Sequence, residues 1–282
     1  MKISVIIPTL NASAVIKELL DRLLCQTVKA DEIIVVDSAS DDNTVALAKA
    51  CQNVRVLEIE RREFDHGGTR DLALRASKGD FVIFLTQDAV PANDRLIENL
   101  LRPFEDAQVS GVSGRQLPKA DAKPYERLIR EFNYPAKSFR RTKEDIPRLG
   151  IKTFFFSDAC AAYRREVYLD LGGFEKNLLT DEDLFFAAKM IHAGYALVYA
   201  ADAEVFHSHN LSLQQQYERN RMQGIEFKKH EHLLSGVSLE GEGVKMVIEV
   251  SKSLLSEGKV GNIFAFWLDC GARILGSRVG RK

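Results

Sequence analysis

Short apolar runs and segments of helical periodicity alternate along the first hundred residues. The helical pattern is clearest in Val15, Ile16, Leu19, Leu20, Leu23 and Leu24, which recur at three- and four-residue spacing. The pattern predicts strands at 3–7, 33–36, 54–59 and 81–85, and helices at 15–24, 44–51 and 69–76. Strands that alternate with helices in this order predict an α/β fold with a parallel sheet and right-handed crossovers.

The pattern is less regular after residue 100. It predicts strands at 109–114, 153–156, 197–199 and 204–206, a tight segment at 159–163, and helices at 125–132, 164–171 and 184–193. The polar stretch 119–150 is long for a connection inside a compact domain. Because such excursions usually carry function, we interpret it as a lid over a binding site.

Composition narrows the class of protein. The 282 residues suffice for one large α/β domain or two small ones, and 39 Lys and Arg nearly balance 40 Asp and Glu, which argues against a nucleic-acid-binding role. The four cysteines lack metal or redox spacing, so we expect reduced thiols and a cytoplasmic protein. The first apolar run is too short for a signal peptide, and no apolar run is long enough to span a bilayer.

Two predicted strands end at a carboxylate. Asp88 follows the strand 81–85 and Asp37 follows the strand 33–36. In open α/β sheets, ligands bind at the carboxyl ends of the strands, and carboxylate oxygens suit Mg²⁺ or Mn²⁺. Asp88 is therefore a candidate metal ligand, and Asp37 a candidate contact for a base or ribose. The alternative for each is a turn or a helix cap.

The segment 64–70 combines two glycines with a cation. Gly67 and Gly68 permit close approach of a ligand to the backbone, and Arg70 could pair with phosphate oxygens. The glycine spacing fits neither a Rossmann nor a Walker motif, so the segment is weak evidence when taken alone.

A run of acids opens the predicted helix 184–193. The helix dipole favours one or two acids at this position, but Asp181, Glu182 and Asp183 repel one another unless a cation or a substrate balances them. One of these carboxylates could act as a general base.

Two histidines follow the predicted strand 204–206. His207 and His209 lie on the same side of an extended chain, so that either could join Asp88 on a metal. For His209, the sequence favours a surface position with a hydrogen bond to a loop.

Together these motifs resemble the family 2 inverting glycosyltransferases of the GT-A fold. The resemblance covers roughly residues 1–215, in the order that the family has, through 5–11, 34–38, 79–88, 164–174 and 182–195. The variants at 64–70 and 86–89 resemble the bacterial rhamnosyltransferases that build surface polysaccharides from dTDP-L-rhamnose.

The resemblance implies a role for each candidate residue. The donor nucleotide is expected at Pro8, Thr9, Asp37, Ser38, His66, Gly67, Arg70 and Gln87. Asp88 matches the last acid of the Asp-x-Asp metal motif, while Thr86 replaces the first, so His207 is expected to help bind Mg²⁺ or Mn²⁺. Asp183 matches the catalytic base beside Glu182, with Asp181 as the alternative, and Lys189 stands where the family has Arg.

The implied reaction is transfer of L-rhamnose from a dTDP-sugar to a lipid-linked or oligosaccharide acceptor, with inversion. Two alternatives are a transferase for UDP-hexose or UDP-N-acetylhexosamine, and a non-catalytic subunit that binds nucleotide sugars. Titration with dTDP and UDP separates the two nucleotides.

The last part of the chain predicts two amphipathic helices after a glycine-rich connector, 236–243. The first helix spans 244–255, and the second carries an apolar stripe formed by Val260, Ile263, Phe264, Trp267, Ile274 and Leu275. Basic residues dominate the C-terminal end. We expect a GT-A domain at 1–235 and a helical extension at 236–282, which either lies on the cytoplasmic face of the membrane or packs on the catalytic domain or in a homodimer.

Overall fold

A single mixed sheet organises the computed structural model, which describes residues 1–234 and 242–282. Its strand order is β3-β2-β1-β4-β8-β6-β9-β5, and β7 pairs with β9. The strands are β1 (Ile3–Thr9), β2 (Glu32–Asp37), β3 (Val54–Glu58), β4 (Phe81–Leu85), β5 (Val90–Pro91), β6 (Val109–Leu117), β7 (Phe139–Arg141), β8 (Cys160–Arg164) and β9 (Ala196–Phe206).

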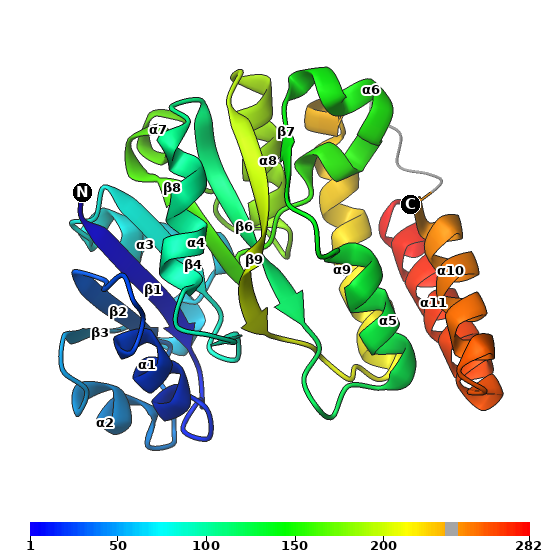
Figure 1. Cartoon of the computed structure of the whole chain (residues 1–282), viewed down its shortest axis with the longest axis horizontal. Coiled ribbons are helices and arrows are strands. Elements are labelled where there is room, and N and C mark those ends of the chain that lie inside the picture. Colours follow the sequence, from blue (N-terminus) through cyan, green and yellow to red (C-terminus); the bar gives the residue numbers. More distant parts are fainter. Residues whose placement is uncertain (235–241) are drawn as a thin grey trace.

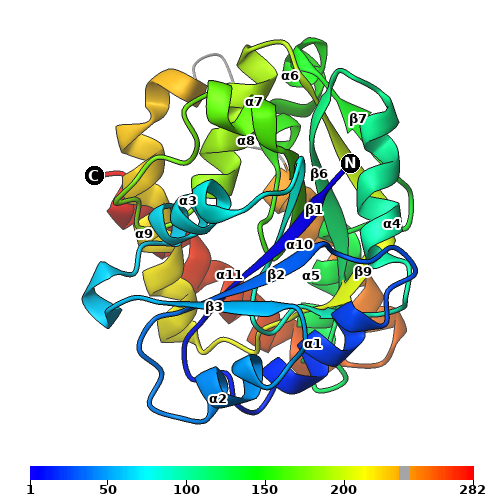
Figure 2. The same ribbon diagram turned by 90° about the vertical axis from the view of Figure 1, so that its left-hand side faces the viewer.

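The first half has the predicted parallel arrangement, in which β1 pairs with β2 and β4, and β2 pairs with β3. The connecting helices are α1 (Ile16–Leu24), α2 (Thr44–Lys49) and α3 (His66–Ala76). Alternating strand residues face opposite sides. Val5 and Ile7 pack with α1, α2 and α4 (Leu96–Leu101), and Ile6 packs with α3, α7 (Arg165–Asp170) and α8 (Glu182–His192). Figure 2 shows α1 and α2 below the parallel strands and α3 above them.

The second half corrects two of the sequence predictions. Residues 153–156 do not form a strand, because a 3-10 helix covers Gly150–Phe154, whereas the predicted tight segment 159–163 is largely the buried strand β8. The predicted strands 197–199 and 204–206 are one strand, β9. Its pairing with β6 shifts register at one point, because Gly114 pairs with Ala200 but Arg115 pairs with Glu204. Residues 201–203 of β9 have no pairing partner on β6 at this irregularity.

The polar stretch 119–150 contains ordered elements. They are α5 (Pro124–Asn133), strand β7, a 3-10 turn (Lys143–Asp145) and α6 (Ile146–Leu149). Strand β7 extends the sheet by antiparallel pairing with β9. Further 3-10 turns lie at Arg61–Glu63, Arg102–Glu105 and Glu231–Leu234.

The long helix α9 (Leu213–Lys229) was not predicted. Only Gln216, Gly224 and Glu226 are buried on it, so the helix has no apolar stripe that a periodicity analysis could detect. Ser212 caps its start by accepting a hydrogen bond from the Gln215 backbone N–H.

The two predicted C-terminal helices are present as α10 (Glu242–Ser256) and α11 (Val260–Gly280). They lie beyond α5 and α9 at one end of the molecule (Figure 1). Val250, Leu254, Phe266 and Cys270 pack with apolar side chains of α5. The expected connector lies outside the described residues at 236–241, and the domain boundary there stays a prediction. None of the described helices has the length and hydropathy needed to cross a bilayer.

Glycines bring α11 into backbone contact with α9. A Cβ atom on Gly276 would collide with the Tyr217 carbonyl oxygen, and one on Gly280 with the Arg221 carbonyl oxygen. Gly224 on α9 is equally close to α11, since its Cβ would lie 2.5 Å from the Ser277 carbonyl oxygen. Side-chain rotation cannot relieve a collision with backbone, so these glycines are required by the packing.

We expect opposite effects from two Gly→Ala substitutions on α11. Gly276→Ala should lower the free energy of unfolding by about 1–3 kcal/mol, because the added methyl group overpacks the contact with α9. Gly271→Ala, where an added Cβ would have no other atom within 4 Å, should raise it by about 0.5–1 kcal/mol through helix propensity. Denaturant unfolding measures both, and equal effects at the two sites would contradict the backbone contact.

Candidate active site

The carboxyl ends of several strands meet at one edge of the sheet. β8 runs antiparallel to both β4 and β6, and β6 runs parallel to β9, so that β1, β2, β4, β6 and β9 all point the same way. Asp37 ends β2, Asp88 follows β4, and His207 follows β9. Segments that are far apart in the sequence therefore supply one group of polar side chains.

Asp88, His207 and His209 form a group that could hold a metal ion. One ligand atom from each lies within 4.8 Å of the other two. His207 Nε2 lies 3.5 Å from Asp88 Oδ1, and His209 Nδ1 lies 3.8 Å from Asp88 Oδ2. His209 is partly exposed at the surface, as expected, but its ring also faces this carboxylate and packs edge-on against the His207 ring, so it could join Asp88 on a metal.

Hydrogen bonds fix the orientation of His207. Gln116 Oε1 accepts from Arg130, and Gln116 Nε2 donates to Ser157 Oγ at 2.9 Å, which assigns the carboxamide orientation. The Oε1 atom lies 2.8 Å from His207 Nδ1, so that Nδ1 carries the proton. The lone pair of Nε2 then faces the Asp88 carboxylate, an arrangement that suits a cation between them.

The protonation states in this group also suit a metal. Burial lowers the pKa of His207, and burial lowers that of His209 to about 4, so both rings are neutral near pH 7. Burial alone would raise the pKa of Asp88, but the contacts with His207 and Lys119 outweigh it and lower that pKa. Lys119 Nζ lies 2.9 Å from Asp88 Oδ2 and pairs with the ionised carboxylate.

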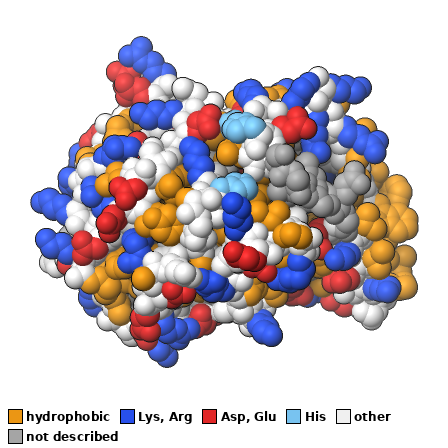
Figure 3. All heavy atoms as spheres, turned by 90° about the horizontal axis from the view of Figure 1, so that it is seen from above, with side chains coloured by type: hydrophobic (Ala, Val, Ile, Leu, Met, Phe, Trp, Pro, Cys, Tyr) orange, Lys and Arg blue, Asp and Glu red, His pale blue; other side chains and the backbone are white. Residues whose placement is uncertain are grey.

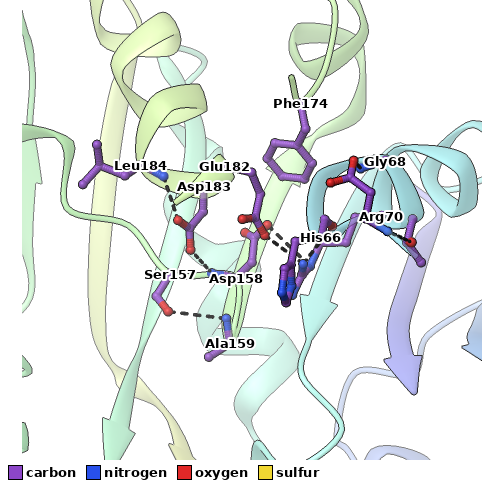
Figure 4. A network of polar contacts seen from close by, with 12 residues as sticks. His66, Gly68, Arg70, Ser157, Asp158, Ala159, Phe174, Glu182, Asp183 and Leu184 are labelled. Carbon is purple, nitrogen blue, oxygen red and sulfur yellow. Dashed lines mark hydrogen bonds and ion pairs between the residues drawn. The ribbon is translucent and has the colours of Figure 1, made fainter. Parts of the chain in front are cut away.

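A second group surrounds Arg70, which is 4% exposed (Figure 4). Its Nη1 atom lies 2.9 Å from Glu182 Oε1, and its Nε atom lies 3.7 Å from Asp158 Oδ2. Asp158 also accepts a hydrogen bond from the Tyr163 hydroxyl at 2.7 Å. The expected contact of Arg70 with phosphate oxygens is not favoured by this geometry, because buried carboxylates occupy the guanidinium. Glu182 likewise pairs with Arg70.

Asp183 and Asp181 border this cluster at the start of α8. Asp183 accepts hydrogen bonds from the backbone N–H groups of Asp158 at 3.0 Å and Leu184 at 2.8 Å. Burial, with the charge of Glu182, raises the pKa of Asp183 to about 6. Burial, with the charge of Asp183, raises the pKa of Asp181 to about 7. Both carboxyl groups are poised to exchange protons near neutral pH.

Asp181 has strained backbone and an available oxygen. Its φ of +64° is a left-handed conformation that non-glycine residues seldom adopt. Its Oδ1 atom accepts a hydrogen bond from Gln223 Nε2 at 3.0 Å, while its Oδ2 atom is buried without a hydrogen-bond partner among the described residues.

Hydrogen bonds connect the metal group, which is Asp88, His207 and His209, with the acid group at the start of α8, which is Asp181, Glu182 and Asp183. Gln116 contacts His207 on one side and Ser157 on the other, and the next residue, Asp158, donates its backbone N–H to Asp183. The charge of Arg219 acts on the pKa of both His209 and Asp181. Asp88 and Asp183 thus belong to one continuous polar region.

A cavity of about 180 Å³ borders both groups. His209 on its wall belongs to the metal group, and Gln223 on its wall bonds Asp181. The rest of its lining is rich in amides, guanidinium groups and aromatic rings, from α5, α9 and α11 and the loops beside them: Glu126, Ile129, Arg130, Asn133, Tyr134, Phe155, Gln216, Arg219, Asn220 and Arg273.

Five of the residues expected at the nucleoside, Pro8, Thr9, Asp37, Ser38 and Gln87, lie at or just after the ends of β1, β2 and β4. Asp37 is buried and accepts hydrogen bonds from Thr9 Oγ1 at 2.9 Å and from the backbone and side chain of Ser40. Gln87 bonds both backbone groups of Leu10. The nucleoside-binding role of these residues, and of Pro8 and Ser38, stays a prediction.

The glycine and histidine of the segment 64–70 differ in their surroundings. A Cβ on Gly67 would lie 2.8 Å from the Glu175 carbonyl oxygen, so close approach at this glycine serves packing within the chain. His66, at the first position of α3, is exposed and contacts the Phe64 ring edge-on.

Sequence reasoning missed several residues of the site. Asp158, Gln116 and Lys119 carry no motif, and Arg219 and Gln223 lie on the helix α9 that was not predicted. Contacts with Asp183, His207, Asp88 and Asp181 identify Asp158, Gln116, Lys119 and Gln223, and the cavity lining identifies Arg219. The order Ser157-Asp158 directly before a buried strand is the one signal that could have pointed to Asp158.

Comparison with known proteins assigns the family. The model of glycosyl transferase family 2 matches residues 4–172. The chain belongs to glycosyl transferase family 2. Among relatives in this family, it is 46% identical over 220 residues to the O-antigen chain rhamnosyltransferase RfbN of Salmonella typhimurium, covering 78% of this chain and 70% of the relative. It is 44% identical to the O-antigen chain rhamnosyltransferase WbaN of Salmonella anatum, covering 77% and 69%.

Solved structures agree with the fold of this family 2 member. The mannosyltransferase PcManGT from Pyrobaculum calidifontis, in complex with GDP-Man and Mn²⁺, superposes with a TM-score of 0.70 at 20% identity, over 99% of this chain and 86% of that chain. Staphylococcus aureus TarS, residues 1–349, in complex with UDP-GlcNAc has a TM-score of 0.61 at 18% identity, over 99% of this chain and 91% of that chain. The predicted GT-A fold is confirmed, and the protein is a glycosyltransferase.

Proposed function

We propose that this glycosyltransferase moves L-rhamnose from dTDP-L-rhamnose to a lipid-linked saccharide during synthesis of a cell-surface polysaccharide. The names of the two relatives above 40% identity support the sugar and the polysaccharide. The observation that carries the chemistry is one polar cavity lined both by His209, which groups with Asp88, and by Gln223, which donates a hydrogen bond to Asp181 beside Asp183.

Asp88, His207 and His209 are the residues that would hold Mg²⁺ or Mn²⁺. One carboxylate and two neutral imidazoles fit Mn²⁺ well, and the unprotonated Nε2 of His207 already faces the carboxylate. A bound divalent cation would neutralise charge on the diphosphate leaving group. Lys119, which pairs with Asp88 in this structure, would have to yield that carboxylate to the metal.

Asp183 is the proposed general base. Two backbone N–H groups fix its carboxylate, and its pKa of about 6 leaves it ionised, yet basic enough to accept a proton, near pH 7. It takes the proton of an acceptor hydroxyl, whose oxygen bonds to the anomeric carbon as the bond to the diphosphate breaks. The configuration inverts, and the dTDP leaves. Asp181, with its unpartnered oxygen, is the alternative base.

The cavity between α5, α9 and α11 is the proposed acceptor site. Four amide side chains, those of Asn133, Gln216, Asn220 and Gln223, can pair with sugar hydroxyls, and the rings of Tyr134 and Phe155 can pack on sugar C–H faces. The proposed location of the enzyme is the cytoplasmic face of the cell membrane, where a lipid-linked acceptor is accessible. A homodimer is the competing use of its C-terminal helices.

A donor screen tests the proposed function. Purified protein should release dTDP from dTDP-L-rhamnose faster than UDP from UDP-glucose or UDP-N-acetylglucosamine, and EDTA should abolish the release until Mn²⁺ or Mg²⁺ is restored. Asp88→Asn should weaken metal activation at least about tenfold, since losing even an outer partner of a metal ligand commonly costs that much. Asp94→Asn, an exposed acid near the same strand, is the control.

A preference for UDP-sugars would favour the hexose or N-acetylhexosamine transferase. Binding of nucleotide sugar with no release under any metal condition would favour the non-catalytic subunit.

Asp183→Asn should reduce transfer by about 100- to 10,000-fold, because it removes the general base. Binding of dTDP, measured by thermal shift, should stay near the wild-type value. In the wild-type enzyme, kcat should fall as the pH drops below about 6, since the raised pKa means that Asp183 is protonated there. A flat wild-type pH profile, or an active Asp183→Asn variant, would refute this assignment.

Asn220→Ala should raise KM for the acceptor about fivefold, as expected for the loss of one hydrogen bond to a sugar hydroxyl. The acceptor is the best substrate from a panel of octyl glycosides. Acceptor-free hydrolysis of the donor should stay within about twofold of wild type, because Asn220 is neither one of the candidate metal ligands nor one of the candidate bases. Gln214→Ala, exposed on the same helix, is the matched control. An unchanged KM in Asn220→Ala would place the acceptor elsewhere.

A further inference from the structure

Large apolar side chains are exposed along one face of the C-terminal helices. Phe264 is 66% exposed, Leu275 60% and Trp267 55%, although each is of a type that proteins normally bury. We call this face the apolar face; its members are Val244, Ile248 and Leu255 on α10, and Val260, Phe264, Trp267, Leu268, Ile274, Leu275 and Val279 on α11. Hydrophobic side chains gather at the corresponding end of the molecule in Figure 3.

The charges around the apolar face are mostly positive. Arg278 is exposed and lies three and four residues after Leu275 and Ile274, so it shares their side of α11. Arg281 and Lys282 follow at the exposed end of α11, where the Arg281 guanidinium also lies over the Phe227 ring of α9, and Lys252 is exposed on α10. The single acid of α11, Asp269, is 1% exposed and bonds Arg273 at 2.7 Å, so it contributes no negative charge to the surface.

The opposite side of α11 packs against α5, α9 and α10. Gly276 and Gly280 touch the backbone of α9, and Phe266 and Cys270 are buried against α5 and α10. Rotation of α11 to bury the apolar face would break these contacts. The face therefore points outward as a built feature of the fold, and something other than this chain's described core must cover it.

We infer that the apolar face rests on a lipid bilayer that contains anionic headgroups, with α11 lying in the plane of the membrane surface. Phe264, Trp267 and Leu275 enter the boundary between headgroups and acyl chains, and Arg278, Arg281 and Lys282 contact lipid phosphates. No described helix can cross the bilayer, so the association is peripheral.

Charge favours a membrane over a second copy of the chain. A second copy would bring an identical basic border, and α11 offers no exposed acid to pair with it. Glu249 is the exposed acid on α10, and Glu257, just after that helix, is already paired with Arg127 and Lys259. Anionic headgroups, in contrast, neutralise the cations while the acyl region accepts the apolar side chains.

This inference deepens the proposed function, because α11 serves both the membrane and the acceptor cavity. Arg273 on α11 lines that cavity, only one residue before Ile274 of the apolar face. An acceptor saccharide attached to a membrane lipid would therefore reach the cavity while its lipid stays in the bilayer.

The lone tryptophan of the chain makes the test direct, since Trp267 lies within the apolar face. The 282-residue chain is mixed with vesicles of phosphatidylglycerol and phosphatidylcholine, or of phosphatidylcholine alone. The anionic vesicles should shift the Trp267 emission to shorter wavelength and sediment the protein, and added salt should weaken both effects. Phe264→Gln should reduce partitioning at least about tenfold, as expected for one large buried apolar side chain.

Two controls keep the outcome decisive. Leu72→Gln, at a 47% exposed leucine on α3, should leave vesicle binding unchanged, and Phe264→Gln should keep the wild-type rate of donor hydrolysis. An equal loss of vesicle binding in Leu72→Gln and Phe264→Gln would overturn the inference. The absence of a Trp267 emission shift with anionic vesicles would do the same. A lipid-free dimer with a buried Trp267 in sedimentation and emission measurements would overturn it in favour of a second copy. The vesicle assay uses no donor, so it stands or falls separately from the proposed rhamnosyl transfer.

Discussion

The active-site region depends on one buried cation. Arg70 is placed by α3 between Glu182 of α8 and Asp158, which precedes β8. Without a cation, several carboxyl groups in this small buried volume would take up protons or push the start of α8 away. Burial raises the pKa of Glu182, Asp158 and Asp183, and the charge of Arg70 opposes that rise at all three carboxyl groups. Arg70 thus ties together α3, the start of α8 and the segment before β8. Its positive charge also acts on the pKa of Asp183, the proposed base.

The carboxamide of Gln116 connects the candidate metal ligands with the acids at the start of α8. Gln116, near the end of β6, is held by Arg130 and Ser157 and in turn fixes the His207 ring. The end of β6 therefore positions both His207, which would help bind the leaving group, and the segment before β8 that fixes Asp183, the proposed base. The sheet topology makes this possible, because the reversed strand β8 brings Ser157 and Asp158 back beside the carboxyl ends of β4 and β6.

Local patterns predicted the parallel half of the fold, since strands such as Phe81–Leu85 and helices such as Ile16–Leu24 bury continuous or periodic apolar residues. They did not predict α9, whose buried positions are Gln216, Gly224 and Glu226. Asp88 and His207 could be selected because each follows a strand end. The pairing of Arg70 with Glu182 and the position of His209 depend on contacts across more than a hundred residues of sequence, which no local pattern encodes.

The glycine contact between α9 and α11 bears on how this chain can evolve. Where the two helix backbones are in contact, a larger residue at a contact glycine collides with the carbonyl groups of the other helix. A substitution on one helix therefore requires a compensating change in the other. Recombination that replaced the last two helices would leave the carbonyl groups of Tyr217 and Arg221 facing an ill-fitting neighbour. The packing thus predicts that the C-terminal segment changes together with α9, which lines the proposed acceptor cavity, rather than as an exchangeable module.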